Sequence, residues 1–219
     1  MRLGRYGIYL GDNVPPDGGV MHHLQIMNPS AVILLDGSYA IADWLPQDCL
    51  TIARSRLLFP DNYRLDTYIP PFPRGRDAAE RMLSYAPQQG IRGYMLLNEY
   101  SNKIYGDVRD LAEFEAGAAE IFRMHGKFLL GACWSMGTPE PDMVVAYAKI
   151  FLQHTGSFER IYWGPHGYTD GKAEPRWLER RPWELWQPAL KAAGIEMPRI
   201  IFGECGFDVL GRGGWNRPG

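Results

Sequence analysis

The sequence predicts a single α/β domain of the (β/α)8 TIM-barrel type that is incomplete at its C-terminus. Short apolar runs alternate with stretches of helical periodicity along the chain, which is the pattern of βα units around a parallel sheet. The glycine-rich motifs G-x-G-x-x-G and G-x-x-x-x-G-K-[ST] are absent, so the phosphate-binding loops of a nucleotide-binding open sheet are missing. A barrel is therefore favoured over a doubly wound sheet.

Seven apolar runs are predicted strands. Continuous apolar runs without polar alternation are typical of parallel strands that are buried on both faces. The predicted strands are Tyr6–Leu10, Ala31–Leu35, Thr51–Ser55, Gly93–Asn98, Phe128–Ala132, Arg160–Trp163 and Ile200–Gly203.

Helical periodicity lies between these strands, and several of the helical stretches end at a glycine, as helices often do. The predicted helices are Tyr39–Pro46, Asp77–Gln88, Val108–His125, Pro141–His154 and Pro182–Ala193. A long connection from Leu57 to Arg76 remains after the third strand. A loop of about 20 residues with aromatic content is either a substrate wall at the C-terminal end of the barrel or a structural lid.

Length, charge and hydropathy limit the classes of partner. The 219 residues are 46% hydrophobic, which suits one core and one domain over residues 1–219. A net charge of −2 with scattered basic residues gives no electrostatic footprint for nucleic acid. No apolar stretch approaches the roughly 20 residues of a membrane span, and a signal-peptide core is missing. The chain as given is predicted to be soluble, without a membrane or nucleic-acid partner, and its compartment stays unknown.

Two glutamates, Glu99 and Glu204, each follow an apolar run directly. They are predicted to lie at the C-terminal ends of the fourth and seventh strands, with three βα units between them. Two carboxyl groups placed in this way suggest cleavage of a glycosidic bond. In a retaining enzyme one carboxyl group protonates the leaving oxygen and the other attacks the anomeric carbon, at a separation of about 5–5.5 Å.

In this order of elements the sequence resembles the clan A glycoside hydrolases, which are retaining, cellulase-like (β/α)8 barrels. In that clan an Asn-Glu pair ends the fourth strand and a glutamate ends the seventh, as Asn98-Glu99 and Glu204 do here. The resemblance implies that Glu99 is the acid/base with a raised pKa and that Glu204 is the ionised nucleophile. It also implies that Asn98 bonds the sugar 2-hydroxyl.

The segment after the sixth predicted strand, Trp163–Tyr168, is similar to the His-x-Tyr that many members of the clan carry there. The resemblance implies that Tyr168 donates a hydrogen bond to the nucleophile and that His166 lines the sugar site. A phenol suits this task because it does not titrate near neutral pH.

Three further residues near predicted strand ends are candidates for substrate binding. Trp134 stacks on a sugar ring or packs in the core. Arg54 is expected to point inward, toward Glu204 or a substrate hydroxyl. Asp36 bonds a sugar hydroxyl or stabilises a turn.

The predicted function is a retaining glycoside hydrolase that acts on a β-linked oligo- or polysaccharide without a cofactor or a metal. Two alternatives stay open: a non-catalytic carbohydrate-binding barrel and a structural module of a larger protein. Only 15 residues follow Glu204, too few for an eighth strand and helix. The first and seventh strands are then unpaired edges, which proteins normally cover. Three explanations fit the missing eighth unit: a trimmed parent protein, a partner chain that closes the barrel, or a divergent open barrel.

Overall fold

Seven parallel strands form one sheet in the order in which they occur in the chain. The computed structural model describes residues 7–65, 68–100, 104–134, 139–169, 181–203 and 205–207, with the backbone alone at 167–169 and 205–207. Sequential order is the order of a βα barrel, whereas a doubly wound sheet reverses direction at a switch point. The strands are β1 (Gly7–Leu10), β2 (Ala31–Leu34), β3 (Leu50–Arg54), β4 (Gly93–Met95), β5 (Phe128–Gly131), β6 (Ile161–Trp163) and β8 (Arg199–Ile200).

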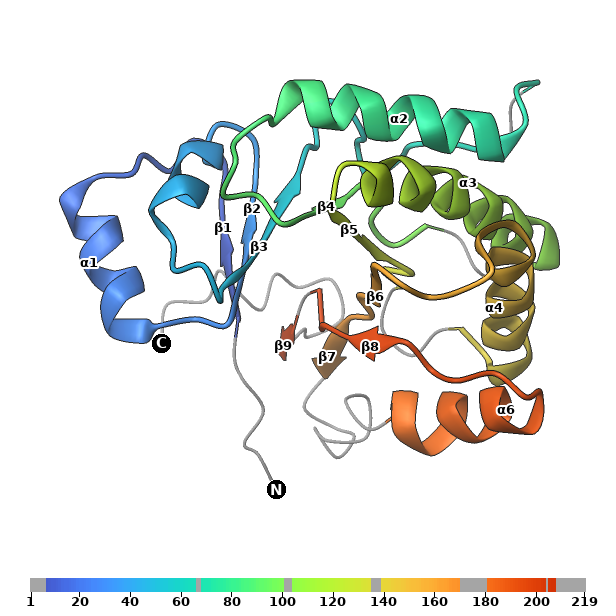
Figure 1. Ribbon diagram of the computed structural model, residues 1–219. Coiled ribbons are helices and arrows are strands. Elements are labelled where there is room, and N and C mark those ends of the chain that lie inside the picture. Colours follow the sequence, from blue (N-terminus) through green and yellow to red (C-terminus); the bar gives the residue numbers. More distant parts are fainter. Residues whose placement is uncertain are drawn as a thin grey trace.

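The sheet curls into a half-barrel with helices on its outer side (Figure 1). Every neighbouring pair of strands is parallel. Within the described part of the chain, β1 and β8 each pair on one side only. The predicted incomplete (β/α)8 fold is therefore confirmed. That a further segment or a partner chain closes the barrel stays a prediction.

The helices follow the predicted order, with one helix added and the bounds of others changed. They are α1 (Gly18–Met27), the 3-10 helix η1 (Tyr39–Trp44), α2 (Pro71–Tyr85), α3 (Tyr105–Met124), α4 (Pro141–Thr155), the π-helical turn η2 (Pro182–Trp186) and α6 (Gln187–Ala192). Helix α1 was not predicted; Asp17 caps its first turn by accepting from the Val20 N–H at 2.9 Å. Helix α2 begins at Pro71 and not at Asp77, because proline suits the first turn of a helix.

The connection before α2 packs onto the core. Phe59 and Leu65 are each 1% exposed, and the ring of Tyr63 lies 5.5 Å from that of Phe59. The guanidinium group of Arg74 sits over the Tyr63 ring at 5.4 Å. In its described residues 57–65 this segment therefore fits the structural alternative better than the substrate wall.

Helices α2 and α3 approach each other closely at two glycines. A Cβ atom at Gly117 would lie 2.1 Å from the carbonyl oxygen of Phe72, and one at Gly75 would lie 1.8 Å from that of Phe114. Neither position has room for a methyl group unless the backbones move apart. Glycine thus sets the packing distance of the outer layer.

Two short strands form a separate parallel pair. Strand β7 (Gly167–Thr169) pairs with β9 (Cys205–Phe207), and Tyr168 stands opposite Gly206. The sequence did not predict this pair, because each strand is only three residues long.

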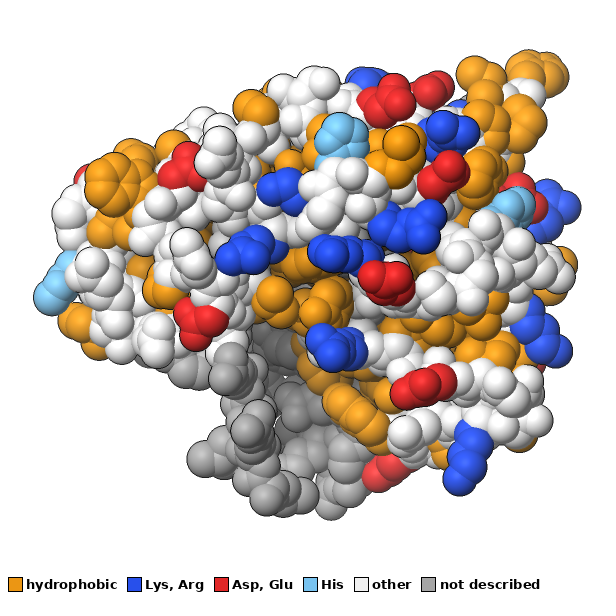
Figure 2. Space-filling view, in the orientation of Figure 1, with side chains coloured by type: hydrophobic (Ala, Val, Ile, Leu, Met, Phe, Trp, Pro, Cys, Tyr) orange, Lys and Arg blue, Asp and Glu red, His pale blue; other side chains and the backbone are white. Residues whose placement is uncertain are grey.

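The surface drawn in Figure 2 mixes charges of both signs, with Lys and Arg side chains across its middle and Asp and Glu among them. No helix in the described part of the chain is both long and apolar enough to cross a membrane.

Candidate functional site

A hydrogen bond joins the ends of two strands that are not neighbours. Glu99 follows β4 and His166 follows β6, and the Nδ1 atom of His166 lies 2.9 Å from Oε1 of Glu99. The Glu99 side chain is 44% exposed, whereas that of His166 is completely buried. Because an ionised carboxylate only accepts hydrogen bonds, Nδ1 carries the hydrogen in this contact. Glu99 therefore faces outward, with His166 behind it.

The end of β5 holds both partners by their backbones. Cys133 accepts a hydrogen bond from the Glu99 N–H at 2.8 Å, and Trp134 accepts one from the His166 N–H at 2.9 Å. Glu99 has a φ of 48° and Ala132 a φ of 50°, in the left-handed region that residues other than glycine rarely adopt. Such backbone conformations cluster at functional sites, where the surrounding structure enforces them.

The pKa of Glu99 lies below its ordinary value of 4.5. The hydrogen bond from His166 is the largest favourable cause, and the charges of His166 and Arg54 act in the same direction against the effect of burial. Glu99 is therefore a carboxylate at neutral pH.

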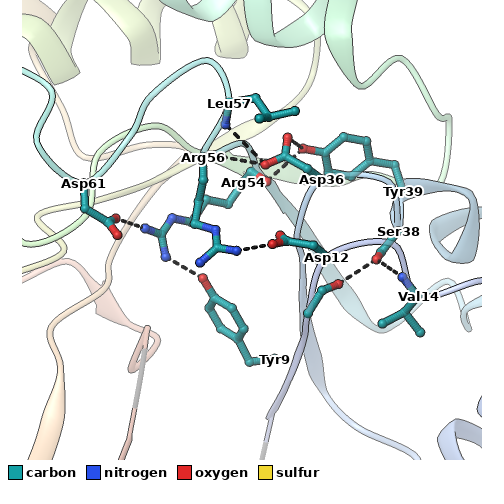
Figure 3. Close-up of polar contacts among 11 residues, drawn as sticks. Tyr9, Asp12, Val14, Asp36, Ser38, Tyr39, Arg54, Arg56, Leu57 and Asp61 are labelled. Atoms are coloured by element: carbon teal, nitrogen blue, oxygen red, sulfur yellow. Dashed lines mark hydrogen bonds and ion pairs between the residues drawn. The ribbon is translucent and has the colours of Figure 1, made fainter.

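Arg54, the last residue of β3, brings a buried positive charge to the same end of the sheet. It is 3% exposed and donates hydrogen bonds to the Tyr9 hydroxyl and to Asp61 (Figure 3). Arg56 lies two residues beyond the end of β3; it pairs instead with Asp12, and its side chain is 48% exposed. Arg54 thus lies at the same end of the sheet as Glu99 and His166, and Tyr9 contacts it there.

Asp36 stabilises a turn, which is the second of its two predicted roles. Its carboxylate accepts from the backbone N–H groups of Arg56 and Leu57 and from the hydroxyl of Tyr39 (Figure 3). Burial raises the pKa of Asp36, but hydrogen bonds from Ser55, the Arg56 backbone and other donors outweigh it, and the pKa is lowered. Its role is to fix the chain that leaves β3, and thereby Arg54.

Trp134 packs in the core, which is the second of its two predicted roles, and not against a substrate. It has no exposed surface, and its ring packs edge-on against Tyr147, Trp163 and Trp186 at 5.2–5.4 Å. Asn98 is half-buried beside Glu99, and its Oδ1 atom is buried with no hydrogen-bond donor among the described residues.

Two predicted residues cannot be placed in the site. Glu204 lies outside the described residues, and so does the side chain of Tyr168, whose backbone belongs to β7. The predicted contact between Tyr168 and the nucleophile stays a prediction. Among the described residues, no group of three or more His, Cys, Asp or Glu side chains could hold a metal ion.

Sequence reasoning missed a buried acid behind this site, Glu115 on α3. It occupies the apolar stripe of that helix, seven residues after Val108 and seven before Phe122, where a charged residue is out of place. An acidic residue in such a stripe is a signal that the sequence does contain. Tyr9 and Asp61 carry no comparable signal, because only the fold brings them to Arg54.

The fold and the site together define an incomplete parallel βα barrel with charged residues at the C-terminal ends of its strands. No family model matches the chain, and no curated protein matches it significantly. A solved structure with which it can be superposed is that of an L-ribulose 3-epimerase, at 12% sequence identity. The match covers 94% of this chain and 81% of that chain with a TM-score of 0.49.

The prediction of a retaining glycoside hydrolase is corrected. The structure named above, one of several that match, is that of an epimerase, and no family model confirms the resemblance to clan A glycoside hydrolases. The geometry of Glu99 points the same way. An acid/base needs a raised pKa, but the contact with His166 lowers the pKa of Glu99.

Proposed function

We propose that the protein is an enzyme that removes a proton from a small polyhydroxylated substrate of the carbohydrate class, at the C-terminal ends of its strands. Glu99 is the general base, His166 holds it in place, and Arg54 supplies positive charge. The Glu99–His166 contact carries the proposal, because it joins a carboxylate that faces outward to a buried imidazole. In barrels of this type the active site lies at this end of the strands.

The charge state of Glu99 selects the chemistry. A carboxylate with a lowered pKa accepts a proton but is a weak base, so the hydrogen that it removes must be activated. A C–H bond beside a carbonyl group meets this need: the proton goes to Glu99 and the electron pair moves to the carbonyl oxygen. The positive charge of Arg54 favours that oxygen's negative charge. Return of the proton to the opposite face of the same carbon, with the electron pair coming back from oxygen, balances the reaction as an epimerisation. Return to the former carbonyl carbon, with the proton of the neighbouring hydroxyl group passing to the enolate oxygen, balances it as an isomerisation.

The substrate class follows from the hydrogen-bond acceptors. The Glu99 carboxylate is 44% exposed and only accepts hydrogen bonds, which sugar hydroxyl groups donate. Reducing sugars also carry the carbonyl group that activates a neighbouring C–H bond. Carbohydrate as the substrate is thus retained from the sequence analysis as a proposal, without hydrolysis.

The test is proton exchange with solvent, which needs no knowledge of the product. Aldoses, ketoses and their phosphates are incubated with the protein in deuterium oxide, and loss of C–H signal is followed by proton NMR. We expect exchange at the carbon beside the carbonyl group of at least one sugar. Removal of a general base lowers rates by about 100- to 10,000-fold, so the exchange rate of Glu99→Gln should be lower than that of wild type by this factor.

Asp12→Asn is the matched control. Asp12 follows β1 at the same end of the sheet but pairs with Arg56, and this variant should keep the wild-type rate. Exchange that survives in Glu99→Gln, or no exchange with any sugar of the panel, contradicts the proposal. Sugar binding without exchange would favour the non-catalytic carbohydrate-binding barrel.

A further inference from the structure

A buried carboxyl group lies behind the site, between three elements. Glu115 of α3 is 2% exposed, and its two oxygens accept from the Ala132 N–H at 3.0 and 2.8 Å. The hydroxyl group of Tyr147, on α4, donates to the same carboxyl group. On the strand side Gly131 leaves the necessary room, since a Cβ atom there would lie 2.7 Å from Oε2 of Glu115.

The residue that Glu115 holds is the first of the segment that supports the contact between Glu99 and His166. Ala132 has a φ of 50°, a conformation that needs support from its surroundings. The next two carbonyl groups, of Cys133 and Trp134, accept the N–H groups of Glu99 and His166. A shift of this turn would therefore move both partners, each by a different hydrogen bond.

We infer that Glu115 is a positioning residue that sets the contact between Glu99 and His166 through the segment 132–134. It touches neither partner. A buried polar group stabilises a fold only when its hydrogen bonds are made, and those of Glu115 go to the turn and to Tyr147. An apolar side chain would fill the same stripe of α3 without holding Ala132.

The inference rests on the same Glu99–His166 contact as the proposed function, so its test uses that contact itself and no substrate. The ring nitrogen resonances of His166 are recorded in nitrogen-15-labelled protein, with Glu99→Ala as the reference for a broken contact. In Glu115→Leu we expect the Nδ1 resonance to move most of the way to that reference. Glu115→Gln should keep the wild-type resonance, because its amide oxygen still accepts from Ala132 and its NH2 group donates to Tyr147.

A second variant keeps the test decisive if Glu115→Leu does not fold. In Gly131→Ala the new methyl group displaces the carboxyl end of a flexible side chain, so the fold should survive and the His166 resonance should move in the same direction.

The control for lost stability is Ile121→Ala, which truncates a side chain of α3 that is 3% exposed. This variant should be less stable but keep the wild-type resonance. The inference is overturned if folded Glu115→Leu keeps the wild-type His166 resonance. If Glu115→Leu is unfolded, a wild-type His166 resonance in Gly131→Ala overturns it. A failed exchange assay would leave this result unchanged, so the two proposals fail separately.

Discussion

At the scale of the residue, Glu115 makes stability depend on pH in the direction opposite to that of an ordinary paired carboxylate. Burial raises the pKa of Glu115 from 4.5 to about 7, against hydrogen bonds from Tyr147 and the Ala132 backbone. The folded protein therefore binds a proton between these two values that the unfolded chain has already lost. Stability contributed by this group is complete below pH 4.5 and is lost as the pH rises to about 7.

Glu115→Gln should remove this dependence. Between pH 4.5 and pH 7 the wild-type protein should lose about 3 kcal/mol of unfolding free energy relative to the variant. This magnitude follows because one pKa unit corresponds to about 1.4 kcal/mol. Urea denaturation at several pH values measures it. Tyr147 is a titratable group that faces Glu115, and burial raises its pKa well above 10, so it stays protonated over this range. A difference that is independent of pH would contradict this account of Glu115.

At the scale of the element, the outer layer depends on the close approach of α2 and α3. Gly117 lies in the middle of α3, where a helix normally favours alanine. Here the carbonyl oxygen of Phe72 occupies the place of the missing methyl group. Packing between the two helices therefore outweighs helix propensity at this position.

Gly117→Ala should destabilise the protein by about 1–3 kcal/mol, the usual cost of overpacking. Gly106→Ala is the matched control in the same helix, because nothing lies within 4 Å of a Cβ atom there. Alanine at Gly106 should be neutral or stabilising by up to about 1 kcal/mol. Thermal or urea denaturation of the two variants measures the contrast. Equal effects of the two substitutions would mean that α2 and α3 do not meet as described.

At the scale of the whole molecule, the fold follows from the sequence because parallel strands buried on both faces leave continuous apolar runs. Apolar runs do not fix where a strand ends. Leu96 and Leu97 are buried like the residues of β4, but the strand ends at Met95. Helix α1 escaped prediction because it begins with two glycines, which are poor helix formers. A capping aspartate before them was the remaining signal.

The position of the candidate site could be predicted from the sequence, but the protonation state of Glu99 could not. Glu99 and His166 follow predicted strands, so their position at one end of the barrel could be inferred. Their contact spans 67 residues of sequence and passes over β5, and no local pattern indicates it. The pKa of Glu99 depends on that contact, which is why a role as an acid could be inferred from sequence and overturned by structure.

The central claim is that Glu99 is a carboxylate kept ionised by His166, and the pKa of Glu99 tests it most directly. Its carboxyl carbon resonance in carbon-13-labelled protein, assigned with Glu99→Gln, is followed as the pH is lowered from neutral. We predict a midpoint below 4.5 that rises in His166→Phe, which has no donor, since the hydrogen bond from His166 is the largest cause that lowers it. A midpoint above 4.5, or one that ignores the loss of His166, would contradict the account.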